Sequence, residues 1–108
     1  MKQALVYNNN ELAGRLTLTD EKEYVFRYED NYFRDSSKHG ISLTLPKTLQ
    51  EYRSKVLFPF FFNMLAEGLN RRLQSRQLQI DENDNFSLLL STAGSDTIGA
   101  VTIKPVQP

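Results

Sequence analysis

The 108-residue sequence contains no cysteine, and this absence removes a group of functions at once. Disulfides, cysteine nucleophiles and thiolate metal sites are excluded, and the composition fits a reducing compartment. The sequence also has a single histidine, His39. One histidine without cysteine does not supply half of a typical zinc site, and a catalytic histidine needs a neighbouring nucleophile and an orienting acid. We therefore interpret His39 as a solvated loop residue and expect no metal or cofactor.

An excess of charge of one sign is also missing, because 13 basic residues balance 13 acidic ones. No overall field attracts nucleic acid or an anionic membrane, and we expect neither as a direct partner. The charges are unevenly placed, since residues 47–76 hold six basic residues against two acidic ones. This local excess is typical of a solvated helix face. It also fits a basic rim that attracts an acidic protein surface.

Long hydrophobic runs are absent as well. The longest, Val56 to Phe62, contains Pro59 and is far too short to span a membrane. Near the N-terminus the apolar run is only Ala4 to Tyr7, which is too short for the core of a signal peptide. These features predict a cytoplasmic protein. An apolar fraction of 40% in a chain of this length predicts one folded domain over residues 1–108.

Three strands are predicted in the first 28 residues, separated by two polar turns. The strands span residues 2–7, 11–19 and 23–28, with turns at 8–10 and 20–22. Asparagine in the first turn tolerates the positive φ that a hairpin requires, and Gly14 indicates a bulge or bend in the second strand. In the third strand, Tyr24, Phe26 and Tyr28 occupy every second position and so share one face.

The segment that follows is predicted to be mostly irregular. Residues 29–40 are polar and predict a long loop with at most one short turn of helix. Ile41, Leu43 and Leu45 then alternate with polar residues, which predicts a half-buried strand that Pro46 ends. Residues 47–57 fit neither a helix nor a strand pattern clearly.

The C-terminal half predicts helices. Pro59 suits the first turn of one helix, and Gly68 ends or kinks it before residues 69–78 continue. A second helix has Asp84 as its N-cap, Gly94 after its last turn, and an apolar face of Phe86, Leu89, Leu90 and Ala93. Residues 100–103 form a last short strand. We therefore predict a single α+β domain, with a mainly antiparallel, curled sheet and two or three helices in the C-terminal half.

The segment Phe58 to Gly68 carries more large apolar side chains than one buried helix face needs. A helical projection places Phe58, Phe61, Phe62, Leu65 and Leu69 on one face. Phe60 and Met64 point roughly the opposite way, beside Glu67 and Arg71. A helix that is apolar on two sides is either wedged between layers or offers one side to another protein.

Three further patterns have simpler structural interpretations than chemical ones. The glycines of residues 94–99 lack the Lys-Ser/Thr of a phosphate loop. The acidic residues Asp81, Glu82 and Asp84 lack the ligand spacing of a calcium loop. The aromatic strand could stack bases, but only Arg27 accompanies it, so core packing is favoured. No catalytic constellation remains, and we predict a non-enzymatic protein. A small enzyme or ligand-binding barrel is the remaining alternative of a different class.

Four segments, in order along the chain, resemble one family. They are Leu12-Ala13-Gly14-Arg15-Leu16, the alternating run Ile41 to Pro46, the helical run Phe61 to Gly68, and the pair Asp84-Asn85-Phe86 with Gly94 to Val101. Together they are similar to the N-terminal subdomain of HipA-type serine/threonine kinases of bacterial toxin–antitoxin systems. Ala66 stands where that family usually has proline, and this difference allows the helix to continue toward Leu69 without the break that proline would cause.

The resemblance implies a role beside a kinase. The chain ends at Pro108, before the ATP-binding and catalytic motifs of the family begin. It therefore looks like the free-standing version, HipS, of tripartite HipBST systems, in which HipS is the antitoxin, HipT the kinase and HipB the operator-binding protein. This implies direct binding to a HipT-like kinase, with a HipB-like protein in a ternary complex. The alternative is an N-terminal structural subdomain, or fragment, of a full-length HipA-like kinase.

Six residues are candidates for the kinase contact. Phe60 and Met64 are the predicted apolar anchors. Charged residues of the same segment would form a rim around these anchors. Gly68 would end the helix within this segment. The predicted partner-binding set is Phe60, Met64, Glu67, Gly68, Arg71 and Arg72.

Overall fold

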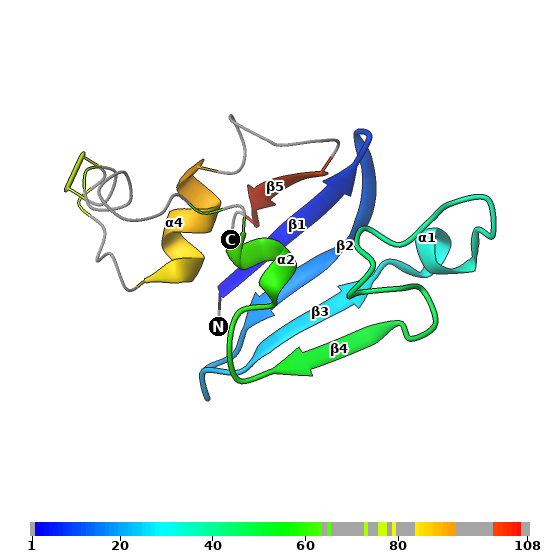
Figure 1. The fold of residues 1–108 in the computed structure, drawn as a ribbon, viewed down its shortest axis with the longest axis horizontal. Coiled ribbons are helices and arrows are strands. Elements are labelled where there is room, and N and C mark those ends of the chain that lie inside the picture. The colour runs from blue at the N-terminus through cyan, green and yellow to red at the C-terminus, as the bar shows by residue number, and fades with distance from the viewer. Residues whose placement is uncertain are drawn as a thin grey trace.

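The computed structural model describes residues 2–63, 65, 73, 76, 77, 79, 84–92 and 101–106 (Figure 1). Within these residues five antiparallel strands form one sheet in the order β4-β3-β2-β1-β5. The strands are β1 Lys2–Asn8, β2 Glu11–Leu18, β3 Tyr24–Tyr28, β4 Glu51–Ser54 and β5 Val101–Pro105. The helices are α1 Asp30–Arg34, α2 Pro59–Phe62 and α4 Asn85–Thr92. The predicted α+β class with an antiparallel sheet is confirmed.

The turn between β1 and β2 follows from its asparagines. Asn9 and Asn10 have φ of 52° and 66°, the conformation that a two-residue hairpin turn needs at both positions. Asn8 and Glu11 pair across this turn, and Lys2 pairs with Leu18 at the far end. The hairpin predicted from the sequence is therefore confirmed.

Gly14 lies beside the predicted irregularity in β2. Val6 pairs with Gly14 and Tyr7 pairs with Leu12, so Ala13 is the extra residue of a bulge. A Cβ atom added to Gly14 would lie 2.6 Å from the carbonyl oxygen of Arg27 and 2.8 Å from the Phe26 ring. Glycine is therefore what allows β3 and its aromatic side chain to approach β2 this closely.

The core lies on the face of the sheet that α2 and α4 cover (Figure 1). The side chains of alternate strand positions meet there with those of the two helices. The largest fully buried side chains are Tyr28, Phe26, Phe61, Phe86, Leu16, Leu45, Leu88, Leu89, Ile103 and Val6. The three aromatic residues predicted to share a face of β3 do so, since all three contact this core.

The strand predicted for residues 41–45 is wrong. Ser42 and Leu45 form an isolated bridge that closes a tight turn, with the Leu45 N–H donating to the Ser42 carbonyl over 3.1 Å. Leu43, at the tip of this turn, is 100% exposed, while Ile41 and Leu45 are buried. The Ser42 hydroxyl explains the difference, because it accepts from the Thr44 N–H and so favours a turn over an extended strand.

The hydroxyl of Tyr28 fixes both ends of that turn to the sheet. It donates to the Leu45 carbonyl and accepts from the Ile41 N–H, 3.0 Å away. All of these groups are buried, so each would be unsatisfied without the hydroxyl. Burial also raises the pKa of Tyr28 to about 12. We call the two hydrogen bonds of this hydroxyl the Tyr28 clamp, because together they hold the turn at residues 41–45 against the sheet.

Asp84 begins α4 as predicted. Its side chain accepts from the Ser87 N–H over 3.1 Å, and its carbonyl accepts from the Leu88 N–H over 3.1 Å. Burial raises the pKa of Asp84, but the hydrogen bonds from Ser87 and the charges of Lys2 and Lys22 outweigh it and lower the pKa overall. The predicted helix stop at Ala93 and Gly94 lies outside the described residues.

We predict that Tyr28→Phe lowers the free energy of unfolding by about 3 kcal/mol, because two buried backbone groups lose their partner. Urea unfolding of both proteins measures this loss. Tyr24→Phe is the matched control, because no hydrogen bond of its hydroxyl is found among the described residues, and it should change stability by less than about 0.5 kcal/mol. Equal effects of the two substitutions would contradict the clamp.

We also predict that the capping contribution of Asp84 depends on pH. A lowered pKa in the folded state means that this contribution is fully present above the unfolded pKa and is lost as the pH falls through the folded value. Asp84→Ala should cost about 1 kcal/mol at pH 7, and the difference from the unsubstituted protein should shrink toward about pH 3. Asp84→Asn keeps an acceptor and should show the smaller loss and little of the pH dependence. Thermal unfolding at a series of pH values tests both.

Candidate protein-binding surfaces

The first candidate surface is the segment that begins with α2. Pro59 is the first helical residue, as predicted, and Asn63 caps the end by donating its N–H to the carbonyls of Pro59 and Phe61. This helix therefore ends at Phe62, earlier than the sequence suggested. Residue 64 and residues 66–72 lie outside the described residues, and with them the predicted break at Gly68.

The faces of α2 are only partly as predicted. Phe58, Phe61 and Leu65 are buried, but Phe62 is 41% exposed and the prediction that it faces the core is wrong. Phe60, predicted to point away from the core, is half-buried and packs its ring 5.2 Å from that of Phe61.

The cause of this error is the short length of α2. Phe58, with φ of −56° and ψ of 137°, precedes the helix, and Asn63 caps its end, so neither Phe58 nor Leu65 belongs in a helical projection. Without them, Phe60 and Phe62 both lie about 100° from Phe61. Periodicity then gives no preference between the two rings, and tertiary packing decides which one is buried.

Of the six predicted partner-binding residues, the structure describes only Phe60. The other five, Met64, Glu67, Gly68, Arg71 and Arg72, lie outside the described residues. Their common surface with Phe60 therefore stays a prediction. Phe62 is a residue that the sequence analysis assigned to the core and that the structure adds to the exposed apolar surface of α2.

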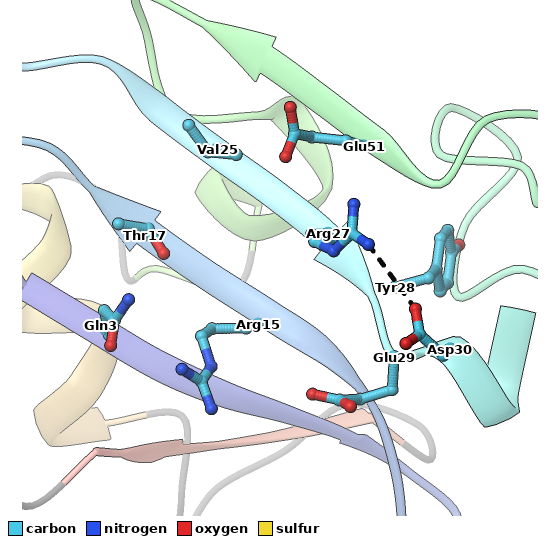
Figure 2. A pocket seen from close by; sticks show the side chains of 9 residues that line it. All are labelled: Gln3, Arg15, Thr17, Val25, Arg27, Tyr28, Glu29, Asp30 and Glu51. Carbon is cyan, nitrogen blue, oxygen red and sulfur yellow. Dashed lines mark ion pairs between the residues drawn. The ribbon is translucent and has the colours of Figure 1, made fainter.

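The second candidate surface is the face of the sheet opposite α2 and α4. We call it the outer sheet face. It comprises the outward positions of all five strands: Gln3, Leu5, Tyr7, Arg15, Thr17, Val25, Arg27, Glu51, Arg53, Thr102 and Lys104. A depression of about 390 Å³ lies on it, and Figure 2 shows the side chains of four strands and of the turn after β3 around it.

The arginines of this face differ in whether a described carboxylate lies close enough to form an ion pair with them. Arg27 lies 3.5 Å from Asp30, and Arg53 lies 3.0 Å from both Glu23 and Glu51. Arg15 is exposed and forms no ion pair with any carboxylate that the structure describes.

The sheet register places Arg15 directly opposite Arg27. Like charges in such a cross-strand pair repel each other, and Asp30 beside Arg27 offsets part of this repulsion. The sequence analysis missed this surface. The signal was present in the alternation of polar and apolar residues, which was used only to find the buried face.

His39 lies outside both surfaces. It is exposed, as predicted for a loop residue, and its carbonyl accepts from the Tyr32 hydroxyl over 2.8 Å.

No cluster of three or more potential metal ligands occurs among the described residues. Within the same part of the chain, no helix is long and apolar enough to cross a membrane. Residues 94–99 and the acidic residues Asp81 and Glu82 lie outside the described residues, while Asp84 caps α4.

Comparison with known proteins identifies the family. The HipA N-terminal domain family matches residues 4–104, which is nearly the whole chain. The chain belongs to the HipA N-terminal domain family. A solved structure titled as the N-terminal domain of HipA toxin has the same fold, with a TM-score of 0.72 and 23% identity over 99% of this chain and 94% of that one.

Relatives of this HipA-type domain come in two sizes. An uncharacterized protein of Haemophilus influenzae is 29% identical, and the match covers 96% of this chain and 92% of the relative. Two proteins of Sinorhizobium fredii named as candidate kinases, Y4mE and Y4dM, are 25% and 30% identical over 93% and 88% of this chain. The matches cover only 24% of each of these two. The domain thus occurs in a relative of similar size and also in much longer proteins.

We predict that Arg15→Thr stabilises the fold, because it removes a like-charge pair and introduces a residue that favours strands. The gain should be about 0.5 kcal/mol, which corresponds to a rise in Tm of roughly 2–4 °C. The rise in Tm should shrink in about 0.5 M NaCl, because salt screens the repulsion between surface charges. At that concentration the Debye length is only a few ångströms.

Lys55→Thr is the matched control for charge, since Lys55 is exposed and lies beyond the end of β4. It should shift Tm by no more than about 1 °C. A fall in Tm for Arg15→Thr would mean that Arg15 stabilises the sheet through contacts other than those described.

Proposed function

We propose that this protein is a kinase-binding module that docks on a HipT-like serine/threonine kinase and neutralises it as an antitoxin. The observation that carries the proposal is the family match over residues 4–104, in a domain that also occurs in a relative of nearly the same length. A relative of that size has no room for a kinase domain as well. A domain of this family that is encoded alone would act on its kinase as a separate chain.

The α2 segment is the proposed contact surface. Phe60 is half-buried, and Phe62 beside it is 41% exposed, so apolar rings are accessible at this helix. Met64 would be the second anchor, Glu67, Arg71 and Arg72 would form a charged rim, and Gly68 would allow a close approach of the kinase. Burying two large apolar side chains contributes on the order of 3–6 kcal/mol before the costs of association.

Inhibition would arise as a shift of population. Docking beside the nucleotide lobe or the active cleft of the kinase would stabilise an inactive arrangement or obstruct substrate access. Either requires that this protein bind the inhibited state more tightly than the active one. A HipB-like DNA-binding protein would join the same assembly through the kinase.

The alternative is that the domain is the structural N-terminal part of a full-length HipA-like kinase. It is favoured by the two Sinorhizobium fredii relatives, of which this chain covers 24% each. The two proposals predict different arrangements of reading frames in the gene. A separate kinase gene after the codon for Pro108 supports the antitoxin, and an uninterrupted reading frame supports the subdomain.

We predict that replacing Phe60 and Met64 together by Ser abolishes neutralisation of the kinase. The measurement is growth of cells that express the kinase from the adjacent gene together with each variant. The same double variant should fail to co-purify with the kinase. Phe62→Ser should weaken neutralisation as well, because Phe62 is the more exposed ring.

Leu43→Ser is the matched control, because it removes a fully exposed apolar side chain from a turn outside the α2 segment. It should neutralise the kinase as well as the unsubstituted protein does. Normal neutralisation by a folded Phe60/Met64 double variant would refute the α2 contact. Failure of the unsubstituted protein to bind the kinase at all would refute the function.

A further inference from the structure

The outer sheet face carries a short row of residues that the proposed function does not use. Leu5 lies on β1, which runs between β2 and the edge strand β5, and it pairs with Arg15 of β2 on one side and with Lys104 of β5 on the other. The three side chains therefore lie side by side across three adjacent strands. The result is a cation, an apolar side chain and a second cation in one row.

Both cations of this row are available to a partner. Neither Arg15 nor Lys104 forms an ion pair with a carboxylate among the residues that the structure describes, and both are exposed. Lys104 rests against an aromatic ring, with its Nζ 5.3 Å from the centre of the Tyr7 ring. This contact leaves the ammonium beside the row and in reach of an anion.

The spacing of the row fits one kind of ligand. Two steps between paired antiparallel strands separate the Cα atoms of Arg15 and Lys104 by about 10 Å. On an α-helix, residues i and i+7 lie about 10.5 Å apart on the same face, with residues i+3 and i+4 between them. A helix with acidic residues at i and i+7 and an apolar residue between them therefore matches the row in both spacing and chemistry.

We propose that the outer sheet face binds an acidic amphipathic helix of a protein partner, through Arg15, Leu5 and Lys104. The partner's two carboxylates pair with the two cations, and its apolar residue packs on Leu5. Binding places a carboxylate beside Arg15 and so reduces its repulsion with Arg27.

The surrounding charges argue against nucleic acid at the same place. Glu29, Asp30 and Glu51 line the same depression as Arg15 (Figure 2). They would repel a continuous phosphate backbone, whose affinity depends on many cations. A helix with two carboxylates places them at Arg15 and Lys104, and the three acidic residues lie on the β3 and β4 side of Arg15, outside the span between these two cations.

This site is independent of the kinase contact proposed above. It lies on the face of the sheet opposite α2 (Figure 1), so both surfaces can be occupied together. Loss of one contact leaves the other intact, and each can be tested in the absence of the other.

The test uses a synthetic helical peptide of about 21 residues, long enough to be helical in water, with Glu at i and i+7 and Leu at i+3 and i+4. Titration followed by NMR should shift the amide signals of Leu5, Arg15 and Lys104 and leave those of α2 unchanged. Arg15→Thr and Lys104→Thr should each weaken binding about threefold, and the double variant about tenfold, as for exposed ion pairs. Binding should also weaken as salt increases.

The variants separate binding from folding. Arg15→Thr should keep or raise Tm while it weakens binding, and a residue with a purely structural role would not do this. Lys55→Thr should bind normally, and a peptide with Lys in place of both Glu residues should not bind. The proposal is refuted if the peptide binds both Thr variants as tightly as the unsubstituted protein. It is refuted equally if the shifts map to α2, or if a single-stranded oligonucleotide binds the face and the peptide does not.

Discussion

The close approach of Phe26 to Gly14 is the contact on which the rest of the sheet depends. A Cβ at position 14 would lie 2.8 Å from the Phe26 ring, so only glycine permits this packing. The ring in turn packs on Phe61 of α2, with centroids 5.8 Å apart, and edge-on against Tyr28 at 4.8 Å. The absence of a side chain at Gly14 thereby allows β2 and β3 to pair in this register and lets the Phe26 ring reach α2. The same register places Arg15 opposite Arg27 on the other face.

The two faces of the sheet consequently have different chemistry. The inner face is closed by α2 and α4 over aromatic and aliphatic side chains, and the Tyr28 hydroxyl ties the turn at residues 41–45 to it. The outer face has no such cover among the described residues and carries charged side chains. Because α2 is a single helical turn, it covers the core with Phe61 and leaves part of Phe62 accessible. A small domain can thus present an apolar contact and a charged contact on opposite sides.

Local rules predicted most of the sheet. Alternation found β1, β2 and β3, the paired asparagines found the hairpin, and Asp84 was recognised as the N-cap of α4. The errors occurred at a turn and at a helix end. The Ser42 hydroxyl favours a tight turn over the strand that the alternation predicts, and α2 is too short for Phe58 and Leu65 to share a helical face with its residues. The row of Arg15, Leu5 and Lys104 could not be predicted, because it exists only through the pairing of β1 with strands from both ends of the chain.

The charges of this protein cancel over the whole chain but not within single segments, or within single rows of residues across the sheet. A net charge of zero gives no long-range attraction, so any partner must be selected by local complementarity. Arg15 lies opposite another arginine and forms no ion pair with the carboxylates that the structure describes, and we expect such a position to be retained most easily when binding uses it. The same reasoning applies to an accessible phenylalanine on a helix of one turn, since hydrophobic burial within the fold would otherwise be more favourable. Arg15 opposite Arg27 and the partly exposed Phe62 ring are, for this physical reason, the candidates for recognition among the described residues.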